Sequence, residues 1–247
     1  MPTSKRVADS VTTSVALAKR LKVTTIIDGA EDMVTDTEAA DTGVTDEPTN
    51  TSERCVVGRP APTFSVPAVL ADGTISTLAL SQFAGKYLVL LFYPADFTFV
   101  CPTEITSFSD HATEFAAMDC AVVVCSTDSE FVHYNWRQQT RKAGGIGEVA
   151  VPMLADRTRE LSRSYGVLCE EEGMAFRGLF IIDTKQVVRV AQINDMPVGR
   201  SVDETLRLVS ALKFADEHGQ VCPANWRKGD AAIDPDIERS KAYFQQS

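Results

Sequence analysis

The chain has 247 residues, of which 44% are hydrophobic and 8% aromatic, and its formal net charge is −10 at pH 7. These values fit a soluble globular protein of one or at most two domains, and the acidic balance argues against electrostatic binding to nucleic acid. The longest apolar run, residues 87–93, is far shorter than the roughly 20 residues that cross a bilayer, so we expect no membrane-spanning segment.

The charge is distributed unevenly along the chain. Residues 1–22 hold five basic residues and one acid, whereas residues 23–54 hold nine acids, one base and no aromatic residue. Such a segment cannot bury enough apolar surface to offset the entropy lost on ordering it. We therefore predict a disordered extension over residues 1–54, a folded domain over 55–219 and a C-terminal arm over 220–247.

The basic residues near the start of the chain form two clusters, Lys5-Arg6 and Lys19-Arg20-Leu21-Lys22. This spacing is typical of a bipartite nuclear-import signal, although such clusters often match by chance. The same stretch is rich in Ser and Thr and nearly free of acids, which also suits a mitochondrial transit peptide. We expect a nuclear or cytoplasmic protein, with the mitochondrion as the alternative.

Alternating strand and helix patterns follow in the folded domain. Apolar runs predict buried strands over residues 87–93, 121–125, 178–183 and 187–193. The last two are separated by a short polar connection, which predicts an antiparallel hairpin. Helical spacing predicts helices over residues 103–118, 130–141, 157–165 and 202–218. This alternation indicates an α/β protein with a central mixed β-sheet flanked by helices.

Six cysteines raise the question of which thiol is chemically special. We expect no structural disulfide framework, because nothing before them resembles a secretory leader. The chain has three histidines and no CxxC or HxxxH spacing, so a zinc site or other metal is not expected either. Cys120 and Cys125 flank a predicted strand five positions apart, which places them on opposite faces as core thiols.

Cys101 differs from the other cysteines in its local context. A predicted strand ends before Pro94, and a helix is predicted to begin near Cys101 and Pro102, with hydroxyl caps available between Thr98 and Thr103. Unpaired backbone N–H groups in the first helical turn favour a thiolate, which is nucleophilic. The residues alone leave open an inert cysteine packed at a strand–helix junction.

The segment around Cys101, FYPADFTFVCPTE, resembles the active-site signature of the typical 2-Cys peroxiredoxins. RGLFIID at 177–183, NDMPVGRS at 194–201 and HGQVCPANW at 218–226 resemble other parts of the same family in the expected order. The resemblance covers residues 57–247. It implies a thioredoxin-like fold and a thiol peroxidase acting on hydrogen peroxide and organic hydroperoxides, with no cofactor.

The resemblance also implies roles for individual residues. Cys101 is expected to be the peroxidatic nucleophile and Cys222 the resolving thiol supplied by the partner subunit of a homodimer. Their disulfide is expected to be reduced by thioredoxin or a similar dithiol protein, and five dimers to form a decamer. Five residues complete the expected site: Thr98 and Arg177 beside the sulfur, Pro94 as a pocket wall, and Glu104 with Arg200 as a supporting pair.

Two further segments bear on regulation and on alternative functions. GGIG at 144–147 and Tyr243-Phe244 resemble motifs that mark enzymes sensitive to overoxidation. In such enzymes the C-terminal helix must unfold before the resolving thiol can act. The alternatives to a peroxidase are a chaperone (holdase) and a redox relay that passes its disulfide to a client protein.

Overall fold

A computed structural model of the protein describes residues 55–245. The predicted disordered extension over 1–54 and the predicted import signal between Lys5 and Lys22 lie outside the described residues. The strands are β1 (Ser65–Val69), β2 (Ile75–Ala79), β3 (Tyr87–Phe92), β4 (Cys120–Ser126), β5 (Met153–Ala155), β6 (Leu168–Cys169), β7 (Met174–Ala175), β8 (Arg177–Ile182) and β9 (Val188–Asn194). The helices are η1 (Leu80–Phe83), α1 (Cys101–Asp110), α2 (Ala112–Ala117), α3 (Glu130–Arg137), η2 (Arg141–Ala143), α4 (Glu160–Ser164), α5 (Val202–His218) and α6 (Lys241–Phe244).

Seven strands form one sheet in the order β2-β1-β5-β4-β3-β8-β9. The pairs β3–β4 and β4–β5 are parallel, and the pairs β1–β2, β1–β5, β3–β8 and β8–β9 are antiparallel. The expected mixed sheet is therefore confirmed, as is the antiparallel hairpin of β8 and β9.

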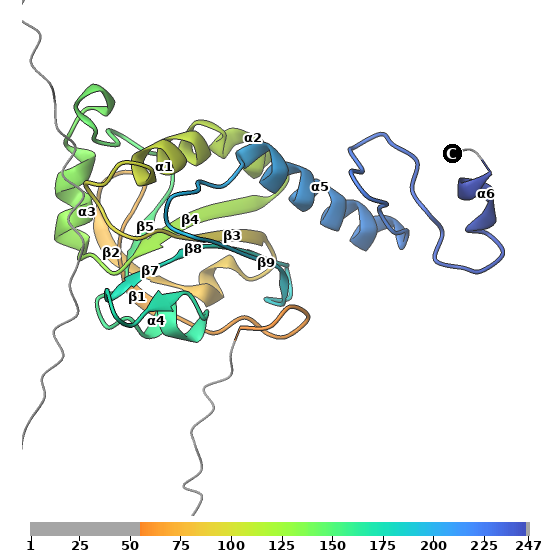
Figure 1. Cartoon of the computed structure of the whole chain (residues 1–247), viewed down its shortest axis with the longest axis horizontal. Coiled ribbons are helices and arrows are strands. Elements are labelled where there is room, and N and C mark those ends of the chain that lie inside the picture. Colours follow the sequence, from red (N-terminus) through yellow and green to blue (C-terminus); the bar gives the residue numbers. More distant parts are fainter. Residues whose placement is uncertain (1–54, 246–247) are drawn as a thin grey trace, which may run out of the picture. The chain divides into compact units, whose positions relative to one another are not determined.

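Side chains from both faces of the sheet are buried, so the protein has two hydrophobic layers. One layer contains Ile105 and Phe108 of α1, Phe115 of α2 and Val209 of α5. The other contains Leu161 of α4 with several residues of the strands. Helices α1, α2 and α5 accordingly lie on one side of the sheet and α4 on the other (Figure 1). The central strand β3 is buried along its whole length, as expected for a strand covered on both faces.

Three predicted helices differ from the observed ones. The helix expected over 103–118 is divided at His111, whose φ of −98° and ψ of 10° are not helical. The helix expected over 130–141 ends at Arg137. The helix expected over 157–165 begins only at Glu160, because Arg159 has a left-handed φ of 62°.

Strands β1, β2 and β5 of the large sheet were not predicted, and neither were the two-residue strands β6 and β7. β1 contains a proline, β2 is exposed or half-buried along its length, and β5 has only three residues, so none gives a long apolar run. Within residues 55–245, no helix has the length and apolar character needed to cross a membrane.

Candidate active site

Cys101 is the first residue of α1 and is completely buried. Pro102 follows it in the first turn, as predicted. The predicted hydroxyl caps are absent, because Val100 holds the capping position and makes no side-chain bond. Thr103 Oγ1 instead donates to the Val100 carbonyl at 2.6 Å. The backbone N–H groups of the first turn are thus not satisfied by a side-chain cap.

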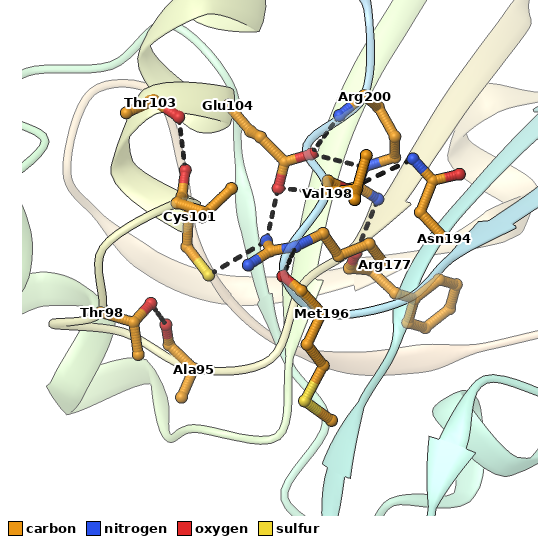
Figure 2. Close-up of polar contacts among 12 residues, drawn as sticks. Ala95, Thr98, Cys101, Thr103, Glu104, Arg177, Asn194, Met196, Val198 and Arg200 are labelled. Carbon is orange, nitrogen blue, oxygen red and sulfur yellow. Dashed lines mark hydrogen bonds and ion pairs between the residues drawn. The ribbon is translucent and has the colours of Figure 1, made fainter.

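Arg177 joins the sulfur of Cys101 to the carboxylate of Glu104 (Figure 2). Its Nη1 lies 3.4 Å from Cys101 Sγ and 2.6 Å from Glu104 Oε2. Its Nε donates to the Met196 carbonyl at 2.5 Å. Arg177 and Glu104 are each only 4% exposed. The guanidinium therefore has a fixed orientation beside the thiol.

Arg200 binds the other side of the Glu104 carboxylate. Its Nε and backbone N–H donate to Oε1 at 2.7 and 2.8 Å, and its Nη2 donates to Oε2 at 3.0 Å. Its Nη1 also donates to the carbonyls of Phe92 and Gly178. Two buried guanidinium groups thus share one buried carboxylate. This leaves one unbalanced positive charge next to the sulfur, which negative charge on the sulfur or on a bound ligand can neutralise.

Thr98 and Pro94 lie in the segment between β3 and α1. The Thr98 hydroxyl donates to the Ala95 carbonyl at 2.8 Å and points at that residue rather than at the sulfur (Figure 2). Pro94 is buried directly after Tyr93. The expected contact between the Thr98 hydroxyl and the sulfur is therefore not formed in this structure.

Cys222 is not paired with Cys101 within one chain. All six cysteines are free, and the Cys222 thiol contacts the Ala211 carbonyl of α5 at 3.5 Å. Cys120 and Cys125 belong to the hydrophobic layers on opposite faces of the sheet, as predicted. Burial raises the pKa of Cys120 to about 12 and that of Cys125 well above its usual value. Both therefore remain protonated near neutral pH.

Sequence reasoning missed a buried polar network behind the Cys101 segment. His133 Nδ1 lies 2.8 Å from Asp96 Oδ2, Tyr93 donates to Asp96 Oδ1 at 2.7 Å, and His133 Nε2 lies 3.0 Å from the Leu154 carbonyl. The network fixes the segment before Cys101 to α3 and β5. The sequence signal available was an acidic residue and a histidine within otherwise apolar surroundings, but nothing local connects residues 37 positions apart.

The burial of His133 and its hydrogen bond with the Asp96 carboxylate act on the pKa of His133 in opposite directions. Burial lowers the pKa. The hydrogen bond and charge of Asp96, together with the Leu154 carbonyl, raise the pKa by more than burial lowers it, so the net shift is upward. The histidines lie on helices or at helix ends, as predicted. Among residues 55–245 no group of three or more His, Cys, Asp or Glu side chains is arranged to hold a metal ion.

Two family models match the chain. The AhpC/TSA family matches residues 57–191, and the C-terminal domain of 1-Cys peroxiredoxin matches residues 211–246. The chain is 56% identical to peroxiredoxin-2 of Bos taurus over 190 residues, which cover 77% of this chain and 95% of that protein. It is 55% identical to a peroxiredoxin of Caenorhabditis elegans over 193 residues, which cover 78% and 96% of the two chains.

Solved structures give the same result. The reduced 2-Cys peroxiredoxin of Plasmodium vivax matches with a TM-score of 0.75 and 37% identity, covering 76% of this chain and 98% of that one. The mitochondrial 2-Cys peroxiredoxin of Plasmodium falciparum matches with a TM-score of 0.65 and 38% identity, covering 68% of this chain and 100% of that one. The expected thioredoxin-like fold is confirmed.

Proposed function

The chain belongs to the AhpC/TSA family and is a peroxiredoxin, a thiol peroxidase, and from this premise we propose that Cys101 is its peroxidatic nucleophile. The Cys101 thiolate attacks one oxygen of a hydroperoxide, a bond forms between sulfur and that oxygen, and the O–O bond breaks. The sulfur is oxidised to a sulfenic acid. The departing oxygen takes up a proton and leaves as water or an alcohol.

The contact between Arg177 and the Cys101 sulfur is the observation that carries this proposal. Negative charge moves from the sulfur to the departing oxygen as the O–O bond breaks. A guanidinium held 3.4 Å from the sulfur, with its other donors already aligned, can stabilise both charges without reorienting. The unbalanced positive charge of the two arginines over Glu104 adds to this stabilisation.

Four other residues support the reaction in this proposal. Glu104 and Arg200 hold the Arg177 guanidinium in place. Pro94 excludes water from the sulfur. The Thr98 hydroxyl donates its hydrogen bond to the Ala95 carbonyl, so its oxygen is left to accept a hydrogen bond from a peroxide O–H and to orient the O–O bond.

Cys222 acts next, as the resolving thiol. Its thiolate attacks the Cys101 sulfur of the partner subunit, the S–O bond breaks, and the hydroxide leaves as water after taking up a proton. The resulting disulfide is reduced by thiol exchange with thioredoxin or a similar dithiol protein. The Cys222 thiol is free and contacts the Ala211 carbonyl of its own α5, which supports a partner in another subunit. The active unit in this proposal is a homodimer, and five dimers form a decamer.

Overoxidation competes with resolution. A sulfenic acid that is not resolved reacts with further peroxide and rises to a sulfinic acid. We propose that α6, the helix that contains Tyr243 and Phe244, delays resolution until it unfolds. Deletion of the residues after Ser240 should make the enzyme more resistant to excess peroxide. Unchanged sulfinylation of Cys101 in mass spectra of the truncated protein would contradict this.

The location of the protein in the cell is also a proposal. The two basic clusters between Lys5 and Lys22 favour the nucleus or cytoplasm, with the mitochondrion as the alternative. Imaging of a C-terminal fluorescent fusion with and without residues 1–22 tests this. Cytosolic fluorescence that does not change when residues 1–22 are deleted would show that the two clusters do not target the protein to an organelle.

Non-reducing gel electrophoresis after one equivalent of peroxide tests the two cysteine roles. The wild-type protein should give a disulfide-linked dimer, and Cys101→Ser and Cys222→Ser should not. Cys169→Ser is the matched control, because Cys169 is another half-buried free thiol and has no proposed role. Peroxide consumption by Cys101→Ser would overturn the assignment of the nucleophile.

A further inference from the structure

One face of α5 carries the loop that contains Cys222. Arg207, Ala211 and Phe214 follow each other at helical spacing, so they lie along the same face. Each contacts the loop. Arg207 Nη1 donates to the Trp226 carbonyl at 3.0 Å, the Cys222 thiol contacts the Ala211 carbonyl at 3.5 Å, and the Phe214 ring lies 4.8 Å from the Trp226 ring.

The loop is closed by its own hydrogen bonds. Val221 and Ile233 exchange two backbone hydrogen bonds of 2.9 Å, and Trp226 Nε1 donates to the Asp230 carbonyl at 3.2 Å. Trp226 is only 2% exposed. The loop therefore binds α5 as a folded unit, with Cys222 next to the closing pair and Trp226 as its apolar anchor.

The orientation of the Arg207 guanidinium is fixed by a residue of its own helix. Its Nε and Nη2 donate to both oxygens of Glu204 at 2.6 and 2.7 Å, one turn earlier in α5. This forked pair fixes the plane of the guanidinium, and only Nη1 points at the Trp226 carbonyl. The contact with the loop thus costs Arg207 little additional side-chain entropy.

The charge of Arg207 also acts on the Cys222 thiol. Burial raises the pKa of Cys222, and the positive charge of Arg207 opposes this rise. Other charged or titratable groups line the clefts between α2, α5 and the loop, namely Glu114, Asp203, Glu204, Lys213, Glu217, His218, Arg227 and Lys228. Arg207 is the group among them whose charge acts on this thiol.

We propose that Arg207 is the positioning residue for the resolving step: it holds the Cys222 loop on α5 through the Trp226 carbonyl and keeps a positive charge beside the thiol that attacks the sulfenic acid. This rests on the proposed role of Cys222 as the resolving cysteine. Arg177 and Arg207 then act alike: each places a positive charge near one of the two sulfurs that form the disulfide.

Arg207→Met tests the proposal, because Met keeps much of the side-chain volume and removes both the charge and the donors. Stopped-flow mixing with one equivalent of peroxide separates sulfenic acid formation at Cys101 from disulfide formation. At neutral pH we expect the first step to be unchanged and the second to be about tenfold slower, as for the loss of one hydrogen bond to a charged group. The pH midpoint of the second step should move upward, and the difference from wild type should shrink at high pH.

Arg207→Lys and Arg163→Met complete the experiment. Lys restores the charge without the fork, so it should return the pH midpoint toward the wild-type value. Arg163 makes a similar forked pair with Glu170 far from the loop in the sequence, so Arg163→Met should leave both steps unchanged. A purely structural role for Arg207 would slow the second step equally at every pH.

Three results overturn the proposal. They are a disulfide-forming step in Arg207→Met that is as fast as in wild type, one that is faster, or one with an unchanged pH midpoint. Failure of the underlying function gives a different result, because the Cys222→Ser protein would then still form the disulfide-linked dimer.

Discussion

Arg177, which contacts the Cys101 sulfur, lies in a buried cluster with Glu104 and Arg200, whereas the loop with Cys222 is held on one face of a single helix. Arg177, Arg200 and Glu104 are each less than 10% exposed and come from three separate parts of the domain. Cys222 and its contacts lie on α5 and the adjoining arm, and Cys222 is only partly buried. A buried array of fixed donors suits a step in which charge develops. A loop held by a single helix suits the role proposed for Cys222, because its thiol can be presented to a partner subunit without disturbing the core of its own domain.

Removing the charge of Glu104 is the strongest test of this difference between the two regions. Glu104→Gln keeps the side-chain shape but leaves two buried guanidinium groups without a counter-charge. We expect the free energy of unfolding to fall by about 3–5 kcal/mol, as for other buried pairs that lose one partner. Urea denaturation at pH 7 measures this, and peroxide consumption should fall with it.

Glu170→Gln is the control for that variant. Glu170 also accepts two hydrogen bonds from an arginine, but both side chains are exposed. Solvent screens such pairs, so the urea midpoint should not change measurably. Equal small losses in both variants would show that the Cys101 pocket gains nothing from burial of its charges.

The two tryptophans of the chain sharpen the contrast, because one lies in each region. Trp136 is fully buried near Tyr93, and Trp226 anchors the Cys222 loop. Trp136→Ala should lower the free energy of unfolding of the domain by about 3–5 kcal/mol. Trp226→Ala should open only the loop. Trypsin cleavage after Arg227 or Lys228 should then accelerate at least tenfold, because cleavage follows the population of the open form.

Each tryptophan variant should change only one of the two measurements. Trp226→Ala should leave the urea midpoint of the domain nearly unchanged, and Trp136→Ala should not accelerate cleavage in the loop under conditions where the domain stays folded. If Trp226→Ala lowers the stability of the whole domain by as much as Trp136→Ala, the arm is part of the cooperative core and the two regions do not differ as described.

Local signals explain which elements could be predicted from the sequence. Helix α5 has the predicted bounds because Ser201 caps its start by accepting from the Glu204 N–H and Gly219 ends it with a left-handed φ of 66°. The strands β3, β4, β8 and β9 were found within one residue or so of their ends because each is a long run of apolar residues. The helix over 103–118 was predicted as one element because the change at His111 lies in the backbone and not in the apolar pattern.

The environment of the site could not be read from local patterns. Glu104 and Arg177 were placed in the site only through the resemblance to the family, because Glu104 by itself is an ordinary residue at the start of a helix. Their ion pair joins residues 73 positions apart and depends on the packing of α1 against β8. The same holds for Asp96 and His133, whose pairing requires α3 to cover the segment before Cys101. Tertiary packing, which periodicity does not encode, decides these contacts.

The attachment of α5 to the domain allows a smaller test. Tyr87 donates to Asp216 Oδ2 at 2.5 Å, and Arg189 binds both Asp216 and Asp183. Tyr87→Phe removes one hydrogen bond to a carboxylate, so the free energy of unfolding at pH 7 should fall by about 1 kcal/mol. Because the variant keeps the Arg189 contacts, peroxide consumption should change little.

The pH dependence of the Tyr87 variant identifies its cause. Burial raises the pKa of Asp216, but the hydrogen bonds from Arg189 and Tyr87 outweigh it and the net shift is downward. A carboxyl whose pKa is lowered by folding stabilises the protein above its unfolded pKa of about 3.9, and this contribution is lost as the pH falls through the folded value. The difference between wild type and Tyr87→Phe should therefore narrow below about pH 4. A difference that is constant down to pH 2 would locate the loss in packing instead.

The stability that the buried network behind Cys101 contributes should change with pH in the direction opposite to that of Asp216. We expect this to be the smallest of the effects predicted here. The net shift of the His133 pKa is upward from 6.5, and burial raises the pKa of Asp96 although His133 opposes it. A group whose pKa is raised by folding stabilises the protein fully below its unfolded pKa, and this contribution is lost as the pH rises through the folded value. The segment before Cys101 is therefore destabilised by base, and the attachment of α5 is destabilised by acid.

An NMR titration of the His133 Cε1 proton tests this opposition. The wild-type midpoint should lie above 6.5. In Asp96→Asn it should fall, because burial then acts without the carboxylate and lowers the pKa. His133→Gln identifies the resonance by removing it. A wild-type midpoint at or below 6.5 would mean that Asp96 does not compensate the burial of His133, and the segment before Cys101 would then gain no stability on the acid side of neutrality.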